Sequence, residues 1–490
     1  MKLRYLPLED RQNLRVLRHT KDKQLITAIL ESIFRRHYYT MQTLWEYRSW
    51  FYGFTSEELR DHPSIACGLI QIHIHAGNLD KAKETLELLP PDSIFRKSSE
   101  LLIPGTPFEK TLEIIQSFKD SGFAPTNLTL TGGRPTIMNG IWDITPYHEI
   151  LLNNKEKVLD AFRTLFNGSE NYIYEIMLAE ILYQQNKCYD ALIHVVGAIP
   201  FLRKKEHMRI LFVALTLQMY ILIMNDQAAC AETLMEDLKQ QLHHMELDEY
   251  LPNIDALEAW SAMYDGDYAK VMRWMRDGAP DENKNFCVLN LFRYMIKMRA
   301  YIIMGSHMAV TALSSKLLPL LEESKRYMDI CELCLIRAMS DRASGRTNDA
   351  LDRLAYALEL AEKYRYDRLI ADECGRMHAL LTLYKKERGS SEYLERVIKL
   401  AEETTTHHPK YLKEQSASHP PLTEAEKKVI RLLAAGYSNS EISDLLGIAV
   451  DTVKQHCRHI FAKLEVSSRT AAVAKAAELG IIDNISTTKK

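Results

Sequence analysis

The feature that most constrains this chain is a recurring pair of helical segments separated by a short polar turn. The stretch CLIRAMSDRASGRTNDALDRLAYALELA shows the pattern most clearly, with Ala338 and Ala350 on the two segments and Gly345 in the turn. The pattern recurs with drifting spacing around Gly77 and around Gly266. Small residues let the two helices of a pair approach closely. Because one pair cannot bury its apolar stripe alone, neighbouring pairs are expected to stack into a curved solenoid.

This pattern resembles the tetratricopeptide repeat, and it predicts an all-α helical-repeat solenoid over residues 1–412. Pro90, Pro200 and Pro280 are expected to stop the second helix of their pairs. The chain has 490 residues but only 19 Gly and 16 Pro, which favours long helices over turn-rich β structure. The alternative architecture is an unrelated all-helical bundle.

The composition changes near the end of this region. The stretch TTTHHPKYLKEQSASHPP (404–421) is rich in Pro, Ser and His and has no apolar periodicity, so we expect an exposed linker at 413–421. A compact segment is predicted at 422–485. Two capping boxes, Thr423 with Glu426 and Ser438 with Glu441, are expected to start its first two helices.

A third helix is predicted from about Val450 to Leu464. At about 100° per residue one side of it is apolar and the other is polar. The apolar side holds Val453, Cys457, Ile460, Phe461 and Leu464, and the polar side holds Lys454, Gln455 and Arg458. Ser467 or Ser468 is expected to cap a fourth helix that ends at Gly480. A short helix, a tight turn with glycine and a longer helix with a polar outer face form a helix-turn-helix, whose second helix fits the DNA major groove.

The segment resembles the DNA-binding domain of LuxR-type transcription regulators. The matching residues are Leu422, Thr423, Glu426, Gly436, Glu441, Ile442, Leu446, Gly447, Ile448, Thr452, Val453, Lys454, His456, Ile460, Lys463, Leu464 and Arg469. One departure is Ala449, where the family usually has a serine that caps the recognition helix. Asp451 is the candidate replacement cap.

The resemblance implies double-stranded promoter DNA as the partner, bound by a homodimer that forms through the fourth helix, and RNA polymerase as a further partner. From their places on the third helix, Lys454, Gln455 and Arg458 are predicted to reach base edges. The flanking Thr452, His456 and Lys463, together with Arg469, are predicted to contact phosphates.

Residues 421–490 carry ten Lys and Arg against eight Asp and Glu, and the rest of the chain is net acidic. Because phosphate neutralisation provides much of the affinity for DNA, one mildly basic copy should bind weakly and two should be needed. A scaffold whose helix-turn-helix has lost DNA is the alternative function. The retained Lys454, Arg458, Lys463 and Arg469 argue against it.

The repeats are similar to the helical-repeat sensor of maltose-regulator-like members of the LuxR-type group, which implies a small-molecule, peptide or protein effector. Those members also carry an ATPase module, which is not expected here because the repeats begin within the first sixty or so residues. The glycine-rich stretch LTLTGGRPTIMNGIWDI (128–144) lacks the Lys-Ser or Lys-Thr of a phosphate loop, and Pro135 removes an amide. It is interpreted as a structural insert in which Arg134 and Asp143 pair, or as a ligand-contacting loop.

No enzyme is predicted, because no phosphate loop or catalytic arrangement is recognisable. Cys331 and Cys334 have helical apolar spacing and are interpreted as core residues. The histidine pairs lack further ligands at metal-binding spacing, so no metal or cofactor is expected. No apolar run reaches the roughly 20 residues of a membrane helix, and no signal peptide is recognisable, so no membrane contact and a cytoplasmic location are expected.

Overall fold

The structure, a computed structural model, describes residues 15–17, 19–35, 41–104, 106–119, 134–140, 142–166, 168, 170–203, 208–244, 250–283, 286–412, 422–464, 466 and 468–478. Within these residues all regular elements are helices, and the one extended pairing is an isolated bridge between Asn139 and Asp143. The all-α prediction is therefore confirmed. None of the described helices combines the length and the hydropathy that crossing a membrane requires. The predicted linker 413–421 and the predicted helix end at Gly480 lie outside the described residues.

An N-terminal unit precedes the main stack of helices. Its apolar side chains form a cluster of their own that includes Leu30, Phe51 and Ile70. Gly77, with φ of +76°, makes the predicted turn between the helices Pro63–His75 and Leu79–Leu86. The helices are α2 (Lys23–Arg35), α3 (Met41–Glu46), α4 (Arg48–Phe51), α5 (Ser56–Asp61), α6 (Pro63–His75), α7 (Leu79–Leu86) and α8 (Ile94–Glu100). The next helix, α9 (Phe108–Gln116), packs instead with the main stack, and its buried side chains belong to the core of that stack.

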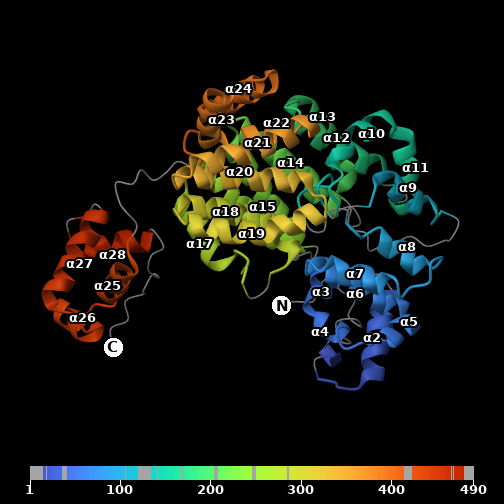
Figure 1. Cartoon of the computed structure of the whole chain (residues 1–490), viewed down its shortest axis with the longest axis horizontal. Helices are drawn as coiled ribbons and strands as arrows, with labels where there is room; N and C mark the ends of the chain where they lie inside the picture. The colour runs from blue at the N-terminus through green and yellow to red at the C-terminus, as the bar shows by residue number, and fades with distance from the viewer. Residues whose placement is uncertain are drawn as a thin grey trace.

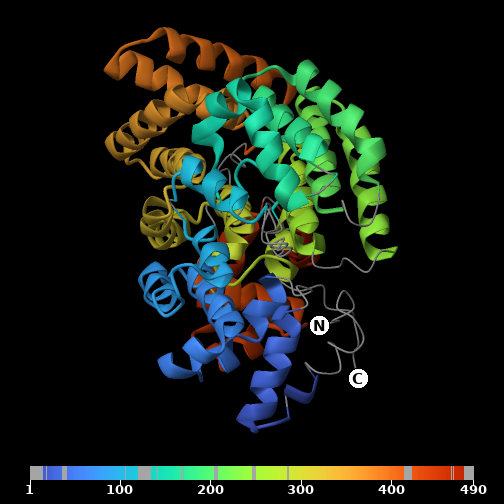
Figure 2. The same ribbon diagram turned by 90° about the vertical axis from the view of Figure 1, so that its right-hand side faces the viewer.

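The following helices form what we call the repeat region. Consecutive helices pack as antiparallel pairs, and the pairs curve around a central space (Figures 1 and 2). The elements are η1 (Thr145–Tyr147), α10 (His148–Asn153), α11 (Lys155–Phe166), α12 (Glu170–Gln184), α13 (Cys188–Leu202), α14 (Met208–Met224), α15 (Ala228–His244), α16 (Leu251–Asp265), α17 (Tyr268–Asp277), η4 (Val288–Asn290), α18 (Leu291–Ile303), α19 (His307–Glu323), α20 (Tyr327–Ala343), α21 (Thr347–Tyr364), α22 (Asp367–Ala371), α23 (Cys374–Arg388) and α24 (Glu392–His407).

The pair α20–α21 shows why the sequence pattern produces paired helices. Ala338 and Ala350 are fully buried where the helices touch, and Gly345 makes the turn with φ of +84°. Small side chains at the contact and a residue that tolerates positive φ are what a close antiparallel pair requires.

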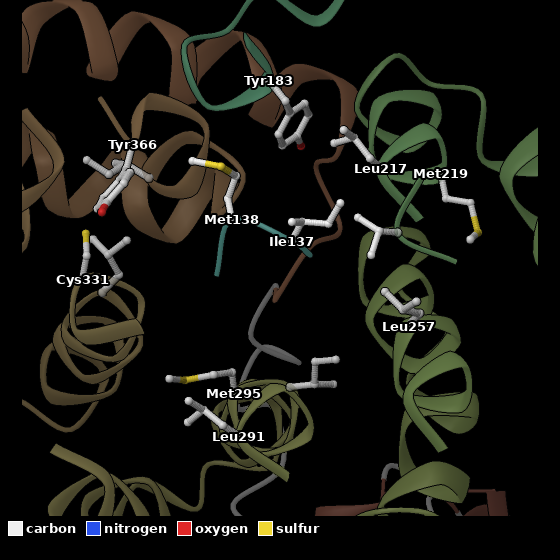
Figure 3. Packing of buried hydrophobic residues seen from close by; sticks show 14 of the residues in the cluster. Ile137, Met138, Tyr183, Leu217, Met219, Leu257, Leu291, Met295, Cys331 and Tyr366 are labelled. Atoms are coloured by element: carbon white, nitrogen blue, oxygen red, sulfur yellow. The ribbon is translucent and has the colours of Figure 1, made fainter. Parts of the chain in front are cut away.

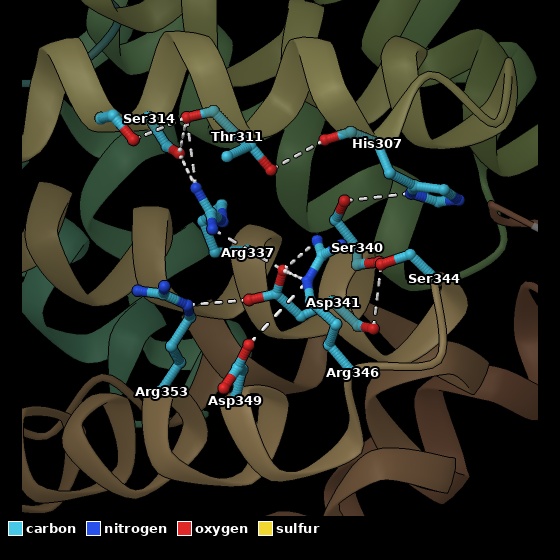
Figure 4. Close-up of polar contacts among 11 residues, drawn as sticks. His307, Thr311, Ser314, Arg337, Ser340, Asp341, Ser344, Arg346, Asp349 and Arg353 are labelled. Carbon is cyan, nitrogen blue, oxygen red and sulfur yellow. Dashed lines mark hydrogen bonds and ion pairs between the residues drawn. The ribbon is translucent and has the colours of Figure 1, made fainter.

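A buried carboxylate strengthens the same pair. Asp341 of α20 is fully buried, and three arginines surround it (Figure 4). Arg353 of α21 lies 2.8 Å from it, Arg346 in the turn 2.6 Å and Arg337 of α20 3.6 Å. The network fixes the turn and both helices to one buried charge, which favours a single register.

The helix-stopping prolines are only partly as predicted. Pro90 and Pro280 lie beyond the ends of α7 and α17, but Pro200 lies inside the last turn of α13. Proline leaves the carbonyl four residues earlier, here that of Val196, without its helical donor. Because Val196 and Pro200 are both on the exposed face, water can satisfy that carbonyl and the helix continues to Leu202.

The C-terminal helices form a third cluster, which we call the tail. Its helices are α25 (Glu424–Ala434), α26 (Asn439–Leu446), α27 (Val450–Lys463) and α28 (Arg469–Glu478). Both predicted capping boxes are present, and Ser468 caps α28 by accepting from the amide of Ala471. The buried apolar side chains of all four helices meet in one small core.

Candidate nucleic-acid interface and central cavity

Helix α27 presents one packed face and one exposed face. Val453 and Ile460 are fully buried, and Cys457 and Leu464 are nearly so, against α25, α26 and α28. On the opposite side Lys454, Gln455 and Arg458 are all exposed, and Thr452 and His456 flank them half-buried. The predicted division of the helix into an inner and an outer face is confirmed.

The turn before α27 is rigid. Gly447 ends α26 in the left-handed region, with φ of 65°, and the Ser443 hydroxyl donates to the carbonyl oxygen of Ile448 at 2.6 Å. Both features hold the angle between α26 and α27. The outer face of α27 is therefore presented by a fixed frame, as insertion into a groove requires.

The start of α27 lacks a side-chain cap. Ala449 occupies the residue before the helix, and its carbonyl oxygen already accepts from the amides of Thr452 and Val453. Asp451, the expected replacement, lies inside the first turn, and its carboxylate pairs with Lys454 at 3.0 Å. The substitute cap is thus not formed.

Two of the predicted phosphate contacts have structural partners. Lys463 lies 2.6 Å from Glu426, a buried carboxylate that also completes the capping box of α25. Arg469 donates to the carbonyl oxygens of Leu433 and Tyr437 and so joins the end of α25 to the start of α28. Both cations therefore stabilise the domain whether or not they also meet a phosphate.

The comparisons agree with this geometry. Residues 420–476 match the family model described as bacterial regulatory proteins, luxR family. The tail is a LuxR-type helix-turn-helix domain. Residues 167–387 match the model of the MalT-like TPR region. This match covers most of the repeat region, which precedes the LuxR-type domain in the sequence. The predicted combination of tetratricopeptide-like repeats with a LuxR-type domain is confirmed.

Two exposed side chains on the outer face of α27 were absent from the predicted set. Asp451 and His459 are both exposed on the side that carries Gln455 and Arg458. Asp451 had been considered only as a cap. The 100° spacing that selected Lys454 places both residues on this face, so the signal was present in the sequence.

The second site is a cavity of about 180 Å³ inside the repeat region. About half of its lining comes from the first helix of successive pairs, namely α12, α14, α16, α18 and α20. The rest comes mainly from residues 364–373 and from the described part of the glycine-rich stretch, residues 134–140 and 142–144, which we call the insert. Figure 3 shows Ile137 and Met138 of the insert between Tyr366 and Leu217, in the middle of the curved stack.

A buried glutamate holds the insert in place. The carboxylate of Glu180, on α12, accepts from the amides of Ile137 (2.8 Å) and Met138 (3.1 Å) and from the hydroxyl of Thr136. Burial raises the pKa of Glu180 to about 7, although these bonds act in the opposite direction. The insert is thus anchored to α12 by a carboxylate that lies in an apolar environment.

The other side of the insert is bound to α20. Arg326 donates to both the backbone and the side-chain oxygen of Asn139, and it pairs with Asp329 at 2.5 Å. Arg134 lies 3.5 Å from Asp329. Asp143 instead accepts from Thr145 and from the amide of Met328. The expected pairing of Arg134 with Asp143 is wrong, because buried Asp329 competes successfully for both arginines.

Carboxylates outnumber cations in the cavity wall. Arg299 of α18 bridges Glu332, at 2.8 Å, and Glu373. Aromatic rings cover the wall formed by α12, α14 and α16, where Tyr220 and Trp260 have centroids 4.7 Å apart. The charged lining residues are the carboxylates Glu180, Asp329, Glu332, Asp372 and Glu373 and the arginines Arg134, Arg299 and Arg365.

Cys331 and Cys334 are buried thiols in the core, as predicted. Burial raises the pKa of Cys334 to about 11, so this thiol stays protonated and unreactive near neutral pH. Among the described residues no cluster of three or more His, Cys, Asp or Glu has the arrangement of a metal site. Residues 128–133 of the glycine-rich stretch lie outside the described residues.

Proposed function

We propose that this protein is a transcription regulator in which the LuxR-type domain (422–485) binds promoter DNA under the control of a sensor formed by residues 1–412, with 413–421 as the linker. The observation that supports this most is the outer face of α27, polar and exposed on a domain whose inner face is fully packed. We also propose contact with RNA polymerase and a location in the cytoplasm.

Within the interface, we propose that Lys454, Gln455 and Arg458 meet base edges. Arginine pairs with the O6 and N7 acceptors of guanine, and glutamine pairs with the N6 and N7 groups of adenine. Thr452, His456, Lys463 and Arg469 are proposed to meet phosphates. In the free domain Lys454 is paired with Asp451, so binding to DNA must replace that exposed pair.

Selection of binding sites from random DNA, with wild type, Arg458→Ala and Arg431→Ala, tests the assignment. Arg431→Ala removes the same charge from an exposed position on α25. Arg458→Ala should relax preference at one base pair per half-site and cost about 1–3 kcal/mol, whereas the control should keep the wild-type preference. Uniform weakening by both variants would show that Arg458 is only a solvated cation. Absence of any specific binding would favour the scaffold function.

We further propose that the sensor detects a small molecule in the central cavity. Apolar and aromatic walls with a few charged groups, enclosed between repeats, are typical of small-molecule sites. The ring faces of Tyr220 and Trp260 favour an organic cation such as an amine, and the carboxylate of Glu332 in the wall can pair with it. Because the insert contacts α12 and α20 at once, an occupant beside it would change how these two helices are held together.

Thermal unfolding of the full chain with a panel of aryl-alkyl amines and the matched neutral alcohols tests this proposal. An amine that binds should raise the unfolding temperature, and its alcohol should not. Glu332→Gln keeps the shape of the wall and should weaken the response to the amine. Stronger stabilisation by alcohols or sugars than by amines would overturn the charge argument.

A further inference from the structure

Helix α13 carries a stripe of large apolar side chains on its solvent side. Tyr189 is 76% exposed, Ile193 55% and Val196 49%. Phe201 is 53% exposed but lies on another side of the helix, where its ring stacks on that of Tyr172. No other described helix carries as many exposed large apolar side chains. Spacings of four and three residues place Tyr189, Ile193 and Val196 within about 60° of one another around the helix.

The opposite face of α13 is also apolar and is already used. Ala191, Val195 and Ala198 are buried against α12 and α14. A helix that is apolar all round is normally covered on all sides. The stripe is therefore the uncovered half of a helix whose sequence suits burial on both faces.

Gly197 adds an independent observation. It is exposed in the middle of α13, and a Cβ added there would meet nothing within 4 Å. Glycine inside a helix costs about 0.5–1 kcal/mol relative to alanine, and nothing within the described chain requires it. A missing side chain on an exposed apolar stripe allows another helix backbone to approach closely, as small residues do at close helix crossings.

We propose that this stripe docks against the same stripe of a second copy of this chain, as an antiparallel pair of α13 helices. A two-fold axis between Val196 and Gly197 places Val196 of each copy over Gly197 of the other. The same axis brings Ile193 opposite Pro200 of the second copy. It also brings Asp190 level with Arg203 of the second copy, since both lie equally far along the chain from the axis. Asp190 and Arg203 are exposed and have opposite charges, so each copy complements itself at both ends.

The interface would be small. A few large side chains per copy bury less than the roughly 1,200 Å² of a standard stable interface, so the pair should be weak and reversible. Its effect would grow on DNA with two half-sites, where each bound tail raises the local concentration of the other copy's α13. The pairing itself does not depend on DNA binding and is measured without it.

Sedimentation velocity of the full chain over a range of concentrations, without DNA, tests the proposal. Wild type should self-associate. Asp190→Arg and Arg203→Asp should each weaken association by about tenfold, and the double variant should restore it. Ile193→Glu and Gly197→Leu should abolish association, whereas Met308→Glu, at a position on α19 that is 83% exposed, should not.

Circular dichroism on each variant confirms that a loss of association is not a loss of folding. A wild type that stays monomeric at the highest attainable concentration would overturn the proposal. So would an association that survives Ile193→Glu and Gly197→Leu. Failure of the double charge swap to restore association would exclude the antiparallel two-fold arrangement.

Discussion

The repeat region and the LuxR-type domain use their charged side chains in opposite ways. In the cavity, Arg299 is 5% exposed and is enclosed by two carboxylates, whereas Lys454 on α27 is 53% exposed and pairs only with an exposed aspartate. Buried charges that are fully paired specify one arrangement of the helices around them. Exposed charges contribute little to stability and remain available to a partner. Substitutions should therefore affect folding in the first region and binding in the second.

The largest effect is expected from Arg299→Ala. The change leaves Glu332 and Glu373 without their shared cation in a buried site, and it should lower the free energy of unfolding of the repeat region by about 3–5 kcal/mol. Urea unfolding of the full chain, followed by circular dichroism, measures this. Arg353→Ala is the matched control, because Arg353 is 35% exposed and Asp341 keeps two other arginines. An equal loss in both variants would show that burial does not set the difference.

The next effect concerns pH. Because the pKa of Glu180 rises from 4.5 to about 7 on folding, the folded state holds a proton that the unfolded state has released over this interval. The contribution of this group to stability should therefore be fully present below pH 4.5 and fall as the pH rises to about 7, by up to about 3 kcal/mol. Asp143, whose pKa burial raises to about 6, adds a change of the same sign.

Unfolding free energies of wild type and Glu180→Gln between pH 4.5 and 7.5 measure the contribution of Glu180. The variant should be less stable at low pH, because the NH2 group of glutamine cannot accept a hydrogen bond, whereas both carboxyl oxygens of Glu180 accept from the insert. Its decline with pH should be shallower than that of wild type. Parallel curves would mean that Glu180 keeps an ordinary pKa in the folded protein.

Lys463→Ala tests the Lys463–Glu426 pair of the LuxR-type domain, in which a buried carboxylate is paired with a cation as in the cavity. Burial alone would raise the pKa of Glu426, but bonds from Lys463 and Thr423 outweigh burial and lower it. Loss of Lys463 should destabilise the domain by about 1–3 kcal/mol. If Lys463 contacts a phosphate, its loss should also reduce the salt dependence of DNA binding, lowering the slope of log K against log salt concentration by about one. Lys428→Ala, on the exposed side of α25, should change stability little. Unchanged stability would contradict the structural role of the Lys463–Glu426 pair.

The smallest effect should come from Ala449→Ser. A serine oxygen before α27 could accept from a free amide of the first turn and stabilise the LuxR-type domain by about 1 kcal/mol. Thermal unfolding of the domain within the full chain detects such a gain. Ala435→Ser, after the end of α25, makes the same chemical change where no amide is free and should leave the unfolding temperature unchanged. A gain in both variants would mean that capping is not the cause.

Local patterns predicted the elements well. The helix pair around Gly345, both capping boxes and the two faces of α27 follow from signals within a few residues of one another. Pro200 was misjudged because its effect depends on whether the carbonyl of Val196 can reach water. That property is set by the packing of α13 and not by the neighbouring sequence.

The cavity could not be predicted in the same way. Glu180, Arg299 and Asp329 lie on three different helices, and each resembles an ordinary polar position in its own helix. Their partners are up to 195 residues away, as in the pair of Arg134 with Asp329. Periodicity reports which residues share a face of one helix, but it does not report which faces meet across the curve of the stack.

The position of the insert also bears on how the protein is made. Each helix pair can fold against its predecessor as it leaves the ribosome, since most contacts join neighbouring pairs. Asn139, however, is bound by Arg326, 187 residues later. Because synthesis proceeds at about 5–20 residues per second, Arg326 is made roughly ten to forty seconds after Asn139. During this interval the insert lacks its contacts with α20, and these contacts complete its attachment inside the repeat region.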